Sequence, residues 1–496
     1  MKKTLFAIAS CMILGFSSCS LQINDDPNAI SSASNDNIFP TAEMNLATTL
    51  GVGFNMYGGY CAQMYGQNAG CTNYLKYSQF EVTAGNTDYS YSQLYARVLQ
   101  QLEVVRNQSQ TEPGSYLAAT VLRAYTYQVL VDAYGETPYS EALTGNTQPK
   151  YDDGKDVYAG IISELEEAKS KASSSDAVCS NLTFGKTTAT QCTADSWIKF
   201  ANSLLLKLYM RESAVVPEAK AKIGALIAEN NFIKEDVVYD KCWGNSVGSY
   251  SPLYQEAKKI SNDLVLNYAT SATIKAEGVN DNRLKAKWNA GNKGVIGTVG
   301  GTNLSSEVPT ATTADFSMPD YTYDMPVYLI TVAEVEFFIA EYYATMEVNH
   351  ANAKSHYEAA VSRSFDMLGV DNVADKVTSE AYPYDSANPM KNIGIQKWLF
   401  YTSILNGFEG WCELRRIGYP EFSGQKAEDI ITNDIAKFNE VPQYYKPGTL
   451  YTPKNVYAPV GAGKLRQRFD YATSSTNYNN NAPATKEPTV PVFWNE

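Results

Sequence analysis

Long helical patterns that recur in pairs constrain the fold of this 496-residue chain more than any other feature. Residues 116–134 contain no proline or glycine, space their apolar side chains along one helical face, and stop before Gly135. Pairs of such segments with short connections recur near residues 91–134, 156–212, 327–368 and 388–417. Recurring antiparallel pairs are typical of tetratricopeptide-like scaffolds. The sequence therefore predicts a mostly α-helical fold with about four helix pairs.

The segments between the helix pairs predict a second, loop-rich part of the molecule. Residues 238–326 and the tail from residue 469 show no helical pattern and are irregular, with long stretches rich in Gly, Ser, Thr and Asn. Structureless loops longer than about 15 residues are uncommon in compact domains and usually either bind something or are disordered. We therefore expect one domain over residues 41–496, in which a helical scaffold carries a loop-rich ligand-binding face.

The N-terminus has the pattern of an exported protein. Lys2 and Lys3 precede an apolar run of the length found in signal peptides, which is too short to span a membrane. Two serines then precede Cys19, much as in the lipobox of bacterial lipoproteins, in which the cysteine is lipidated and becomes the mature N-terminus. An ordinary signal peptide with an incidental cysteine is the alternative. We expect a lipoprotein signal at residues 1–18, lipidation of Cys19 and a polar tether at residues 19–40.

Composition argues against several classes of function. Acidic residues outnumber basic ones by 53 to 40, whereas a nucleic-acid partner needs a basic surface to neutralise phosphate. The chain has only two histidines, His350 and His356, which lie six residues apart and therefore on different faces of one helix. This scarcity argues against histidine-dependent nucleophiles, and no CxxC motif supports a zinc site. We expect no nucleic acid, metal or cofactor.

Paired carboxylates are the catalytic arrangement that the composition leaves open. Glu334 and Glu341 lie seven residues apart on one helical face, and glycoside hydrolases use two such acids. A structural role fits better, because a helix packed among others keeps a buried acid mainly when a cation meets it. Arg415 or Arg416 is the expected cation; adjacent helical residues point about 100° apart, so at most one shares a given pocket.

The cysteines allow a disulfide framework. Six of the eight lie beyond Cys19, and an exported chain permits disulfides. Cys179 and Cys192 flank an expected loop and form the preferred candidate bridge. Cys61 with Cys71 is the next candidate.

Seven motifs in order carry a resemblance to a known family. They are the two serines before Cys19, DPN at 26–28, YGETPYSEAL at 134–143, WIKFANSLLLKLYMR at 197–211, YLITVAEVEFFIAEYYA at 328–344, YEAAV at 357–361 and QKWLFYTSILNGFEGWCELRRIGYP at 396–420. Together they resemble the SusD/RagB family of surface lipoproteins from Bacteroidetes over nearly the whole mature chain. The C-terminal part departs from the family pattern, because FDYA at 469–472 stands where the family often has PYP.

The resemblance implies a non-catalytic nutrient-binding protein, usually for glycans, that caps a SusC-like TonB-dependent transporter in the outer membrane. It also implies four tetratricopeptide-like helix pairs and an irregular remainder that carries the ligand site. The implied partners are an oligosaccharide, the SusC-like transporter and the outer membrane, which the lipid anchor would reach. Binding of peptide or another non-glycan nutrient is the first alternative, and a carboxylate-pair glycoside hydrolase is the second.

The expected ligand site is rich in aromatic residues. The apolar face of a pyranose packs on an aromatic ring, while its hydroxyls need polar partners. In the family, the segment before the first helix pair often lines the site, and here the loop-rich middle adds two tryptophans. For each aromatic residue, ordinary packing is the alternative role. The expected site residues are Tyr74, Tyr77, Tyr89, Trp243 and Trp288, with Asn73 and Asp88 as polar partners.

Overall fold

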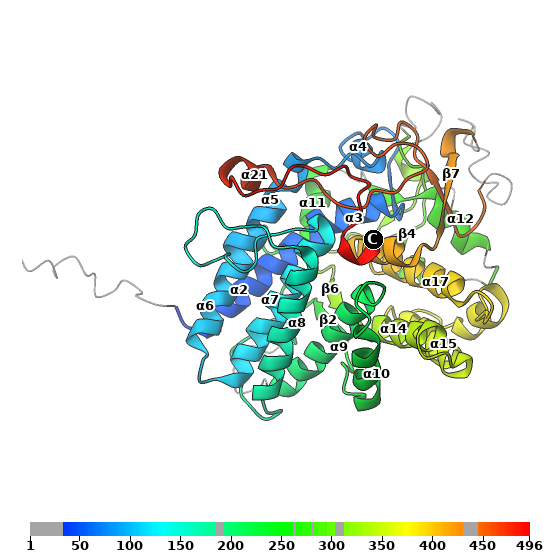
Figure 1. The fold of residues 1–496 in the computed structure, drawn as a ribbon. Helices are drawn as coiled ribbons and strands as arrows, with labels where there is room; N and C mark the ends of the chain where they lie inside the picture. Colours follow the sequence, from blue (N-terminus) through cyan, green and yellow to red (C-terminus); the bar gives the residue numbers. More distant parts are fainter. Residues whose placement is uncertain are drawn as a thin grey trace, which may run out of the picture.

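Helices form most of the molecule in the computed structural model, and short strands join a few of its loops (Figure 1). The structure describes residues 33–184, 193–260, 264–276, 278–279, 281–292, 294–302, 312–429 and 445–496. The expected signal segment and Cys19 lie outside these ranges. In the part of the chain that is described, no helix has the length and apolar character needed to cross a membrane.

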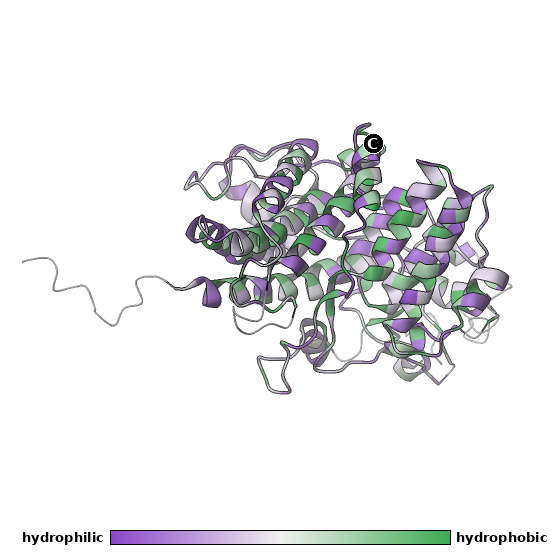
Figure 2. Cartoon of the chain, turned by 90° about the horizontal axis from the view of Figure 1, so that it is seen from below, coloured by the Kyte–Doolittle hydropathy of each residue, from purple (hydrophilic) through white to green (hydrophobic). Residues whose placement is uncertain are grey.

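Four helix pairs build the scaffold, as predicted. Figure 2 shows their helices striped with hydrophobic and hydrophilic residues, as expected for helices that bury one face. In the first pair, α5 (Ala84–Gln93) continues through the π-helical turn η3 (Leu94–Leu99) into α6 (Gln100–Gln108). The partner of α6 is α7 (Pro113–Tyr134), and the later pairs are α8 (Gly154–Lys171) with α9 (Ala194–Glu212), α14 (Val332–Thr345) with α15 (His350–Asp366), and α17 (Pro389–Ser403) with α18 (Gly407–Ile417).

Helix α7 is the most deeply buried of these helices, and its ends follow from its sequence. Pro113 occupies the first turn, where its missing N–H is not needed. The helix ends at Gly135, which has φ of 81°. A side chain at this position would be strained, and its Cβ would also meet the Arg468 guanidinium 2.8 Å away. Gly135 therefore lets the chain turn against the C-terminal segment.

The loop-rich regions contain more helix than the sequence predicts. The expectation of no helix within 238–326 is wrong for α11 (Pro252–Ile260) and α12 (Tyr268–Ala276), and the tail contains α21 (Thr473–Tyr478). These helices have at most nine residues, so they show few helical repeats and depend on tertiary packing. The N-terminal region likewise forms α2 (Asn35–Thr49), η2 (Leu50–Phe54), α3 (Asn55–Cys61) and α4 (Leu75–Ser78).

The start of α2 shortens the expected tether. The sequence places the polar tether at 19–40, but α2 begins at Asn35. Phe39 is fully buried, and its ring centroid lies 5.6 Å from that of Trp197 on α9. Because this contact ties the helix to the scaffold, residues 35–40 belong to the folded part of the chain.

Within the described ranges, four short two-stranded ladders connect the loops. Three are antiparallel: β1 (Tyr65–Gln67) pairs with β3 (Leu264–Leu266), β2 (Val237–Tyr239) with β6 (Val327–Ile330), and β4 (Trp288–Asn289) with β5 (Met318–Pro319). The fourth ladder is parallel and joins β7 (Glu421–Lys426) to β8 (Thr449–Thr452). Each ladder connects segments that are distant in sequence, so the loop-rich part is fixed to several helices at once.

The scaffold core contains a network of buried ion pairs. Arg211 of α9 pairs with Asp132 of α7 and with Glu409 of α18. Lys207, one turn earlier on α9, contacts Glu334 of α14 at 2.9 Å. These side chains are nearly inaccessible to solvent. Each of the three buried acids, Asp132, Glu334 and Glu409, is paired with a cation, which offsets the cost of burying its charge.

Arg416 confirms the expected ion pair between the last two helix pairs. It pairs with Glu341 and contacts Glu413 at 2.7 Å. Burial alone would raise the pKa of Glu413, but nearby cations, led by Arg416, hold it well below its usual range. Arg415 points elsewhere and lies 3.6 Å from the centroid of the Trp411 ring. Glu334 and Glu341 thus have structural partners.

One of the two candidate disulfides is absent. Cys61 is a fully buried free thiol, and burial raises its pKa to about 12. The alternative bridge between Cys61 and Cys71 is therefore wrong, because Cys61 faces the core. Cys192 lies outside the described residues, so its bridge with Cys179 stays a prediction.

Candidate functional site

A cavity of about 560 Å³ opens where the N-terminal helices meet α11. In Figure 1, α2, α5 and α11 lie close together on the same side of the molecule. The cavity is lined by residues of α2, η2, α3 and α5, by the loop at 242–250, and by α11. Its volume falls in the range usual for small-molecule sites.

Four aromatic side chains line this cavity. Tyr89 projects from α5 with 71% of its surface exposed, and Trp243 lines the cavity from the loop at 242–250. The Trp243 Nε1 donates a hydrogen bond to the Tyr239 carbonyl at 2.9 Å, which fixes the indole. Tyr57 and Tyr250 complete the set. The structure therefore brings together Tyr89 and Trp243, two of the expected site residues, although they are 154 positions apart in the chain.

Amide, hydroxyl and carboxylate groups line the cavity together with these rings. Asn86 is held in place because its Oδ1 accepts a hydrogen bond from the Thr83 N–H at 2.9 Å, and its carbonyl accepts one from the Tyr57 hydroxyl at 2.6 Å. The cavity thus offers both hydrogen-bond donors and acceptors beside apolar rings. Its other polar lining residues are Asn45, Thr48, Thr49, Ser90, Gln93, Ser249, Gln255 and Glu256.

Tyr74 and Tyr77 lie behind the cavity wall. Their rings are stacked, with centroids 5.7 Å apart, and Tyr77 meets the edge of Tyr57 at 5.0 Å. The Tyr74 hydroxyl donates a hydrogen bond to the Glu256 Oε1 at 2.9 Å. Burial, reinforced by neighbouring groups, raises the pKa of Tyr57, so its phenol stays a protonated donor. These two expected residues therefore position the wall from behind.

Comparison with known proteins assigns this chain to a family. A family model described as starch-binding and associating with the outer membrane, SusD-like, matches residues 27–437. The chain belongs to the SusD-like family. The predicted SusD/RagB membership is thereby confirmed, and it covers most of the described helices. Among curated protein sequences, none matches this SusD-like chain significantly.

Solved structures share the SusD-like fold at low sequence identity. One is a chitin-binding protein with a TM-score of 0.75 and 19% identity, covering 93% of this chain and 100% of that one. A SusD homologue from Bacteroides uniformis has a TM-score of 0.74 and 20% identity, covering 93% and 99%. A chitin-binding SusD homologue from Flavobacterium johnsoniae has a TM-score of 0.68 and 16% identity, covering 93% and 97%. At these identities the likeness concerns the fold.

Besides Tyr74 and Tyr77, three further expected site residues of this SusD-like protein do not line the cavity. Trp288 is 1% exposed, and its Nε1 donates to the Thr402 carbonyl at 3.1 Å. Pairing of β4 with β5 turns this indole inward, where it packs against Tyr65. Asp88 faces away on α5 and accepts a hydrogen bond from the Ser474 N–H. Asn73 is exposed outside the cavity.

Several lining residues were not singled out from the sequence. Tyr250, Gln255 and Glu256 belong to the segment around α11, and Asn45 belongs to α2. The signal in the sequence is a partly polar face at helical spacing, formed by Asn45, Thr48 and Thr49 of α2 and Val52 of η2. Such a face ordinarily indicates contact with solvent, so only the fold shows that it borders a cavity.

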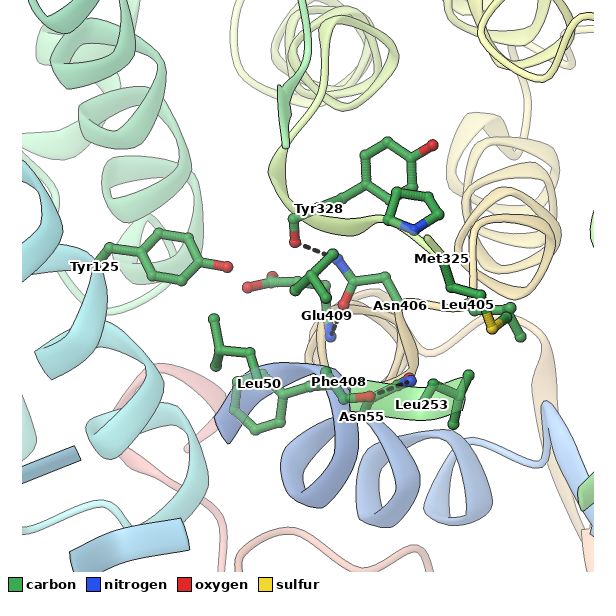
Figure 3. A pocket seen from close by; sticks show the side chains of 13 residues that line it. Leu50, Asn55, Tyr125, Leu253, Met325, Tyr328, Leu405, Asn406, Phe408 and Glu409 are labelled. Carbon is green, nitrogen blue, oxygen red and sulfur yellow. Dashed lines mark hydrogen bonds between the residues drawn. The ribbon is translucent and has the colours of Figure 1, made fainter. Parts of the chain in front are cut away.

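A second, enclosed cavity of the SusD-like fold is too small for a nutrient. It has about 30 Å³ and lies between α7, β6 and α18, beside Glu409 of the buried network (Figure 3). Asn406 donates a hydrogen bond to the Tyr328 carbonyl at 3.3 Å along its wall. This volume accommodates about one water molecule. A third cavity, between α5 and α21, has about 330 Å³. The 560 Å³ cavity is larger than both and is the candidate ligand site.

Metal binding finds no support in the described ranges. Within them, no three His, Cys, Asp or Glu side chains are grouped closely enough to hold a metal ion. His350 lies against the Tyr384 hydroxyl, and His356 against the Glu336 carboxylate. Both histidines thus have partners within the scaffold.

Proposed function

We propose that this protein binds a glycan in the 560 Å³ cavity and delivers it to a SusC-like TonB-dependent transporter. The observation that carries the proposal is the presence of four aromatic rings together with amides and hydroxyls around one cavity. A sugar ring presents an apolar C–H face to an aromatic ring and directs its hydroxyls outward to polar groups. The cavity provides both kinds of partner, and they lie close enough together for one oligosaccharide to contact them all.

Tyr89 and Trp243 are the proposed stacking residues. Tyr89 is largely exposed and stands on α5, while the Trp243 ring is fixed by its hydrogen bond to Tyr239. Fixed rings bind without a large cost in side-chain entropy, whereas the exposed Tyr89 must be ordered on binding. We therefore expect a dissociation constant between about 1 µM and 1 mM, which is weak enough for release to a transporter.

A binding role without catalysis agrees with the side chains at the cavity. Glycoside hydrolysis uses two carboxylates on either side of the bond that is cleaved. Among the described lining residues, Glu256 is the one carboxylate. Glu334 and Glu341, the two acids that the sequence offered as a catalytic pair, form ion pairs with Lys207 and Arg416 in the scaffold.

The N-terminal sequence supports attachment at the outer membrane. Lipidation of Cys19 after removal of residues 1–18 would anchor the protein, because acyl chains gain about 0.8 kcal/mol per buried CH2. The chain between Cys19 and the start of α2 at Asn35 reaches at most roughly 55 Å when fully extended. The ligand cavity would thus stay close to a transporter in the same membrane.

Titration calorimetry against a panel of oligosaccharides and peptides tests this function. Replacing Tyr89 or Trp243 with alanine should weaken glycan binding by about tenfold or more, because each loses a stacking surface. Tyr478→Ala is the matched control, since this tyrosine is also exposed, at 76%, but does not line the cavity. Binding of peptides with no binding of any glycan would replace the glycan assignment by the peptide alternative.

A further inference from the structure

Helix α5 has a hollow on each of its two flanks. Successive helical residues point about 100° apart, so Ser92 and Gln93 lie on opposite sides of Tyr89. Gln93 lines the ligand cavity, whereas Ser92 lines the groove of about 330 Å³ between α5 and α21. Tyr89 itself is exposed and lies between them on the outer face of the helix. The two hollows are thus separated by the exposed face of a single helix.

Helix α21, which forms one wall of the groove, is held beside α5 by hydrogen bonds (Figure 1). The Ser474 and Ser92 hydroxyls are hydrogen-bonded at 3.0 Å, and Asn479, just after the helix, donates to the Pro149 carbonyl at 2.7 Å. None of the residues of α21 is buried. A helix that served only packing would bury an apolar face against its neighbour. Helix α21 instead borders an open space whose shape these hydrogen bonds fix.

The groove combines aromatic rings with polar groups, as the ligand cavity does. Tyr91 and Tyr95 line it, with ring centroids 4.9 Å apart. The Tyr95 hydroxyl donates a hydrogen bond to the Pro138 carbonyl at 2.7 Å, which fixes this ring. Tyr478 adds an exposed third ring at the rim. The polar lining residues are Ser92, Thr147, Ser474, Ser475 and Asn479. A sugar could therefore contact an aromatic face and polar groups here as well.

Unusual backbone conformations occur in the walls of both hollows. The π-helical turn η2 contributes Val52 and Gly53 to the ligand cavity, and η3 contributes Tyr95 and Ala96 to the groove. Such turns are frequent at functional sites. Leu143, which also lines the groove, has φ of 63°, a conformation that bulky side chains rarely adopt. Strained positions of this kind cluster at ligand sites, so the backbone of the groove also supports a binding role.

We propose that the groove between α5 and α21 is a second glycan subsite, and that one long glycan chain passes over Tyr89 to occupy both hollows. The inference rests on the proposed glycan-binding function and defines the length of its ligand. A helix with its side chains is about 10–12 Å across, so the chain must contain several sugar rings. A chain already held in the ligand cavity reaches the groove at a high effective concentration, so even a weak second contact raises its affinity.

Calorimetry with glycans of graded length provides the first test. The probes are starch, cellulose, xylan, mannan and chitin, each partially hydrolysed and fractionated by chain length. Octasaccharides of a series that binds should bind about tenfold more tightly than its disaccharides and trisaccharides, because they reach both hollows. Equal affinity at all lengths would overturn this inference and leave the glycan function intact. No binding of any fraction would overturn both.

Filling the groove provides the second test, because a longer chain could also gain affinity within the ligand cavity alone. Ala96 is exposed on η3 and lines the groove, so Ala96→Trp occupies the groove without replacing a buried side chain. The variant should lose the gain of long glycans and bind short ones within about threefold of the wild type. Tyr89→Ala, in contrast, should weaken both lengths. A folded Ala96→Trp protein that keeps the whole gain would contradict the second subsite.

Tyr478→Ala is a second, milder variant, which decides the question if Ala96→Trp does not fold. It removes an exposed ring from the rim of the groove. Long glycans should bind about threefold more weakly, because they lose one stacking surface. Short glycans, which the ligand cavity holds alone, should keep wild-type affinity, so the variant remains a control for that cavity. Unchanged binding of long glycans would count against the groove.

Ala351→Trp is the matched control for the filled groove. Ala351 is an exposed alanine in the first turn of α15, outside the segments that line either hollow, and it receives the same side chain. This variant should keep the full gain of long over short glycans. An equal loss in Ala96→Trp and Ala351→Trp would show that the effect does not come from the groove, and would overturn the assignment.

Discussion

Arg416 of α18 and Glu341 of α14 are joined by two charge-assisted hydrogen bonds, and the one from Nη2 to Oε2 is 2.6 Å long. Both side chains are largely buried, and Arg416 also reaches Glu413. The two helices belong to the third and fourth helix pairs. The arginine therefore links neighbouring pairs through charge as well as through packing.

Arg416→Met should lower stability strongly and leave ligand affinity unchanged. The substitution leaves Glu341 buried without its cation, and a buried charge that loses its partner costs about 3–5 kcal/mol. Denaturant unfolding of the variant should show this loss, whereas Arg363→Met, at an exposed position on α15, should show little change. Loss of ligand affinity at unchanged stability would instead place Arg416 at the binding site.

Trp288→Ala should lower stability and leave ligand binding nearly unchanged, whereas Trp243→Ala should mainly weaken binding. Trp288 is fully buried and donates a hydrogen bond to Thr402, so its truncation should cost about 3–5 kcal/mol of unfolding free energy. Ligand affinity, measured well below the unfolding transition, should stay within about threefold. If Trp288→Ala abolished binding but barely changed stability, Trp288 would return to the ligand site.

The Glu136→Gln variant should lose less stability than the wild type when the pH is lowered. Burial alone would raise the pKa of Glu136, but hydrogen bonds from Arg468, Lys486 and Tyr471 lower it from 4.5 to about 2. A lowered carboxyl pKa stabilises the folded state above pH 4.5, and this contribution is lost as pH falls toward 2.

Because Glu136 is partly exposed, solvent screening limits its contribution to about 1–2 kcal/mol at pH 7. Urea unfolding at a series of pH values should show the wild type more stable than Glu136→Gln at pH 7, with the difference shrinking below pH 4.5. A difference that is constant between pH 7 and pH 3 would show that the carboxylate charge is not its cause.

Cys19→Ser should release the protein from the membrane fraction. The substitution removes the thiol that lipidation requires, so the acyl chains that would hold the domain at the membrane are absent. Cell fractionation with metabolic labelling by a radioactive fatty acid measures both effects, and Cys242→Ser should retain the label. A membrane-bound, labelled Cys19→Ser protein would favour an ordinary signal peptide and another site of attachment.

The helical spacing of apolar residues predicted the scaffold well, because the long helices repeat this spacing over many turns. The pattern at residues 116–134 became α7, with its end at Gly135. The nine-residue helices α11 and α12 were missed because two turns carry too little periodicity. The strand that buries Trp288 has two residues, so its inward direction depends on pairing with a segment about 30 residues away.

The candidate site was predicted only by residue type. Tyr89 and Trp243 are the kinds of side chain that stack on sugars, and both line the cavity. Glu256 carries no comparable signal, because its place in the cavity wall, where it accepts a hydrogen bond from Tyr74, depends on a contact between distant segments. Tyr74 lies 182 residues earlier in the chain, so this proximity arises from the tertiary fold.

The buried charges also limit how far this scaffold behaves as a modular array. In repeat proteins each unit contacts only its neighbours, so units can be added or removed. Here Arg211 of the second pair binds Glu409 of the fourth pair as well as Asp132 of the first, and Asp132 accepts a hydrogen bond from Trp494, which is 362 residues later in the chain. Removing one helix pair would leave buried charged side chains in the other pairs without their ion-pair partners. The helix pairs therefore share the geometry of repeats, but buried charges join them into one scaffold, and α5 of this scaffold lines the ligand cavity.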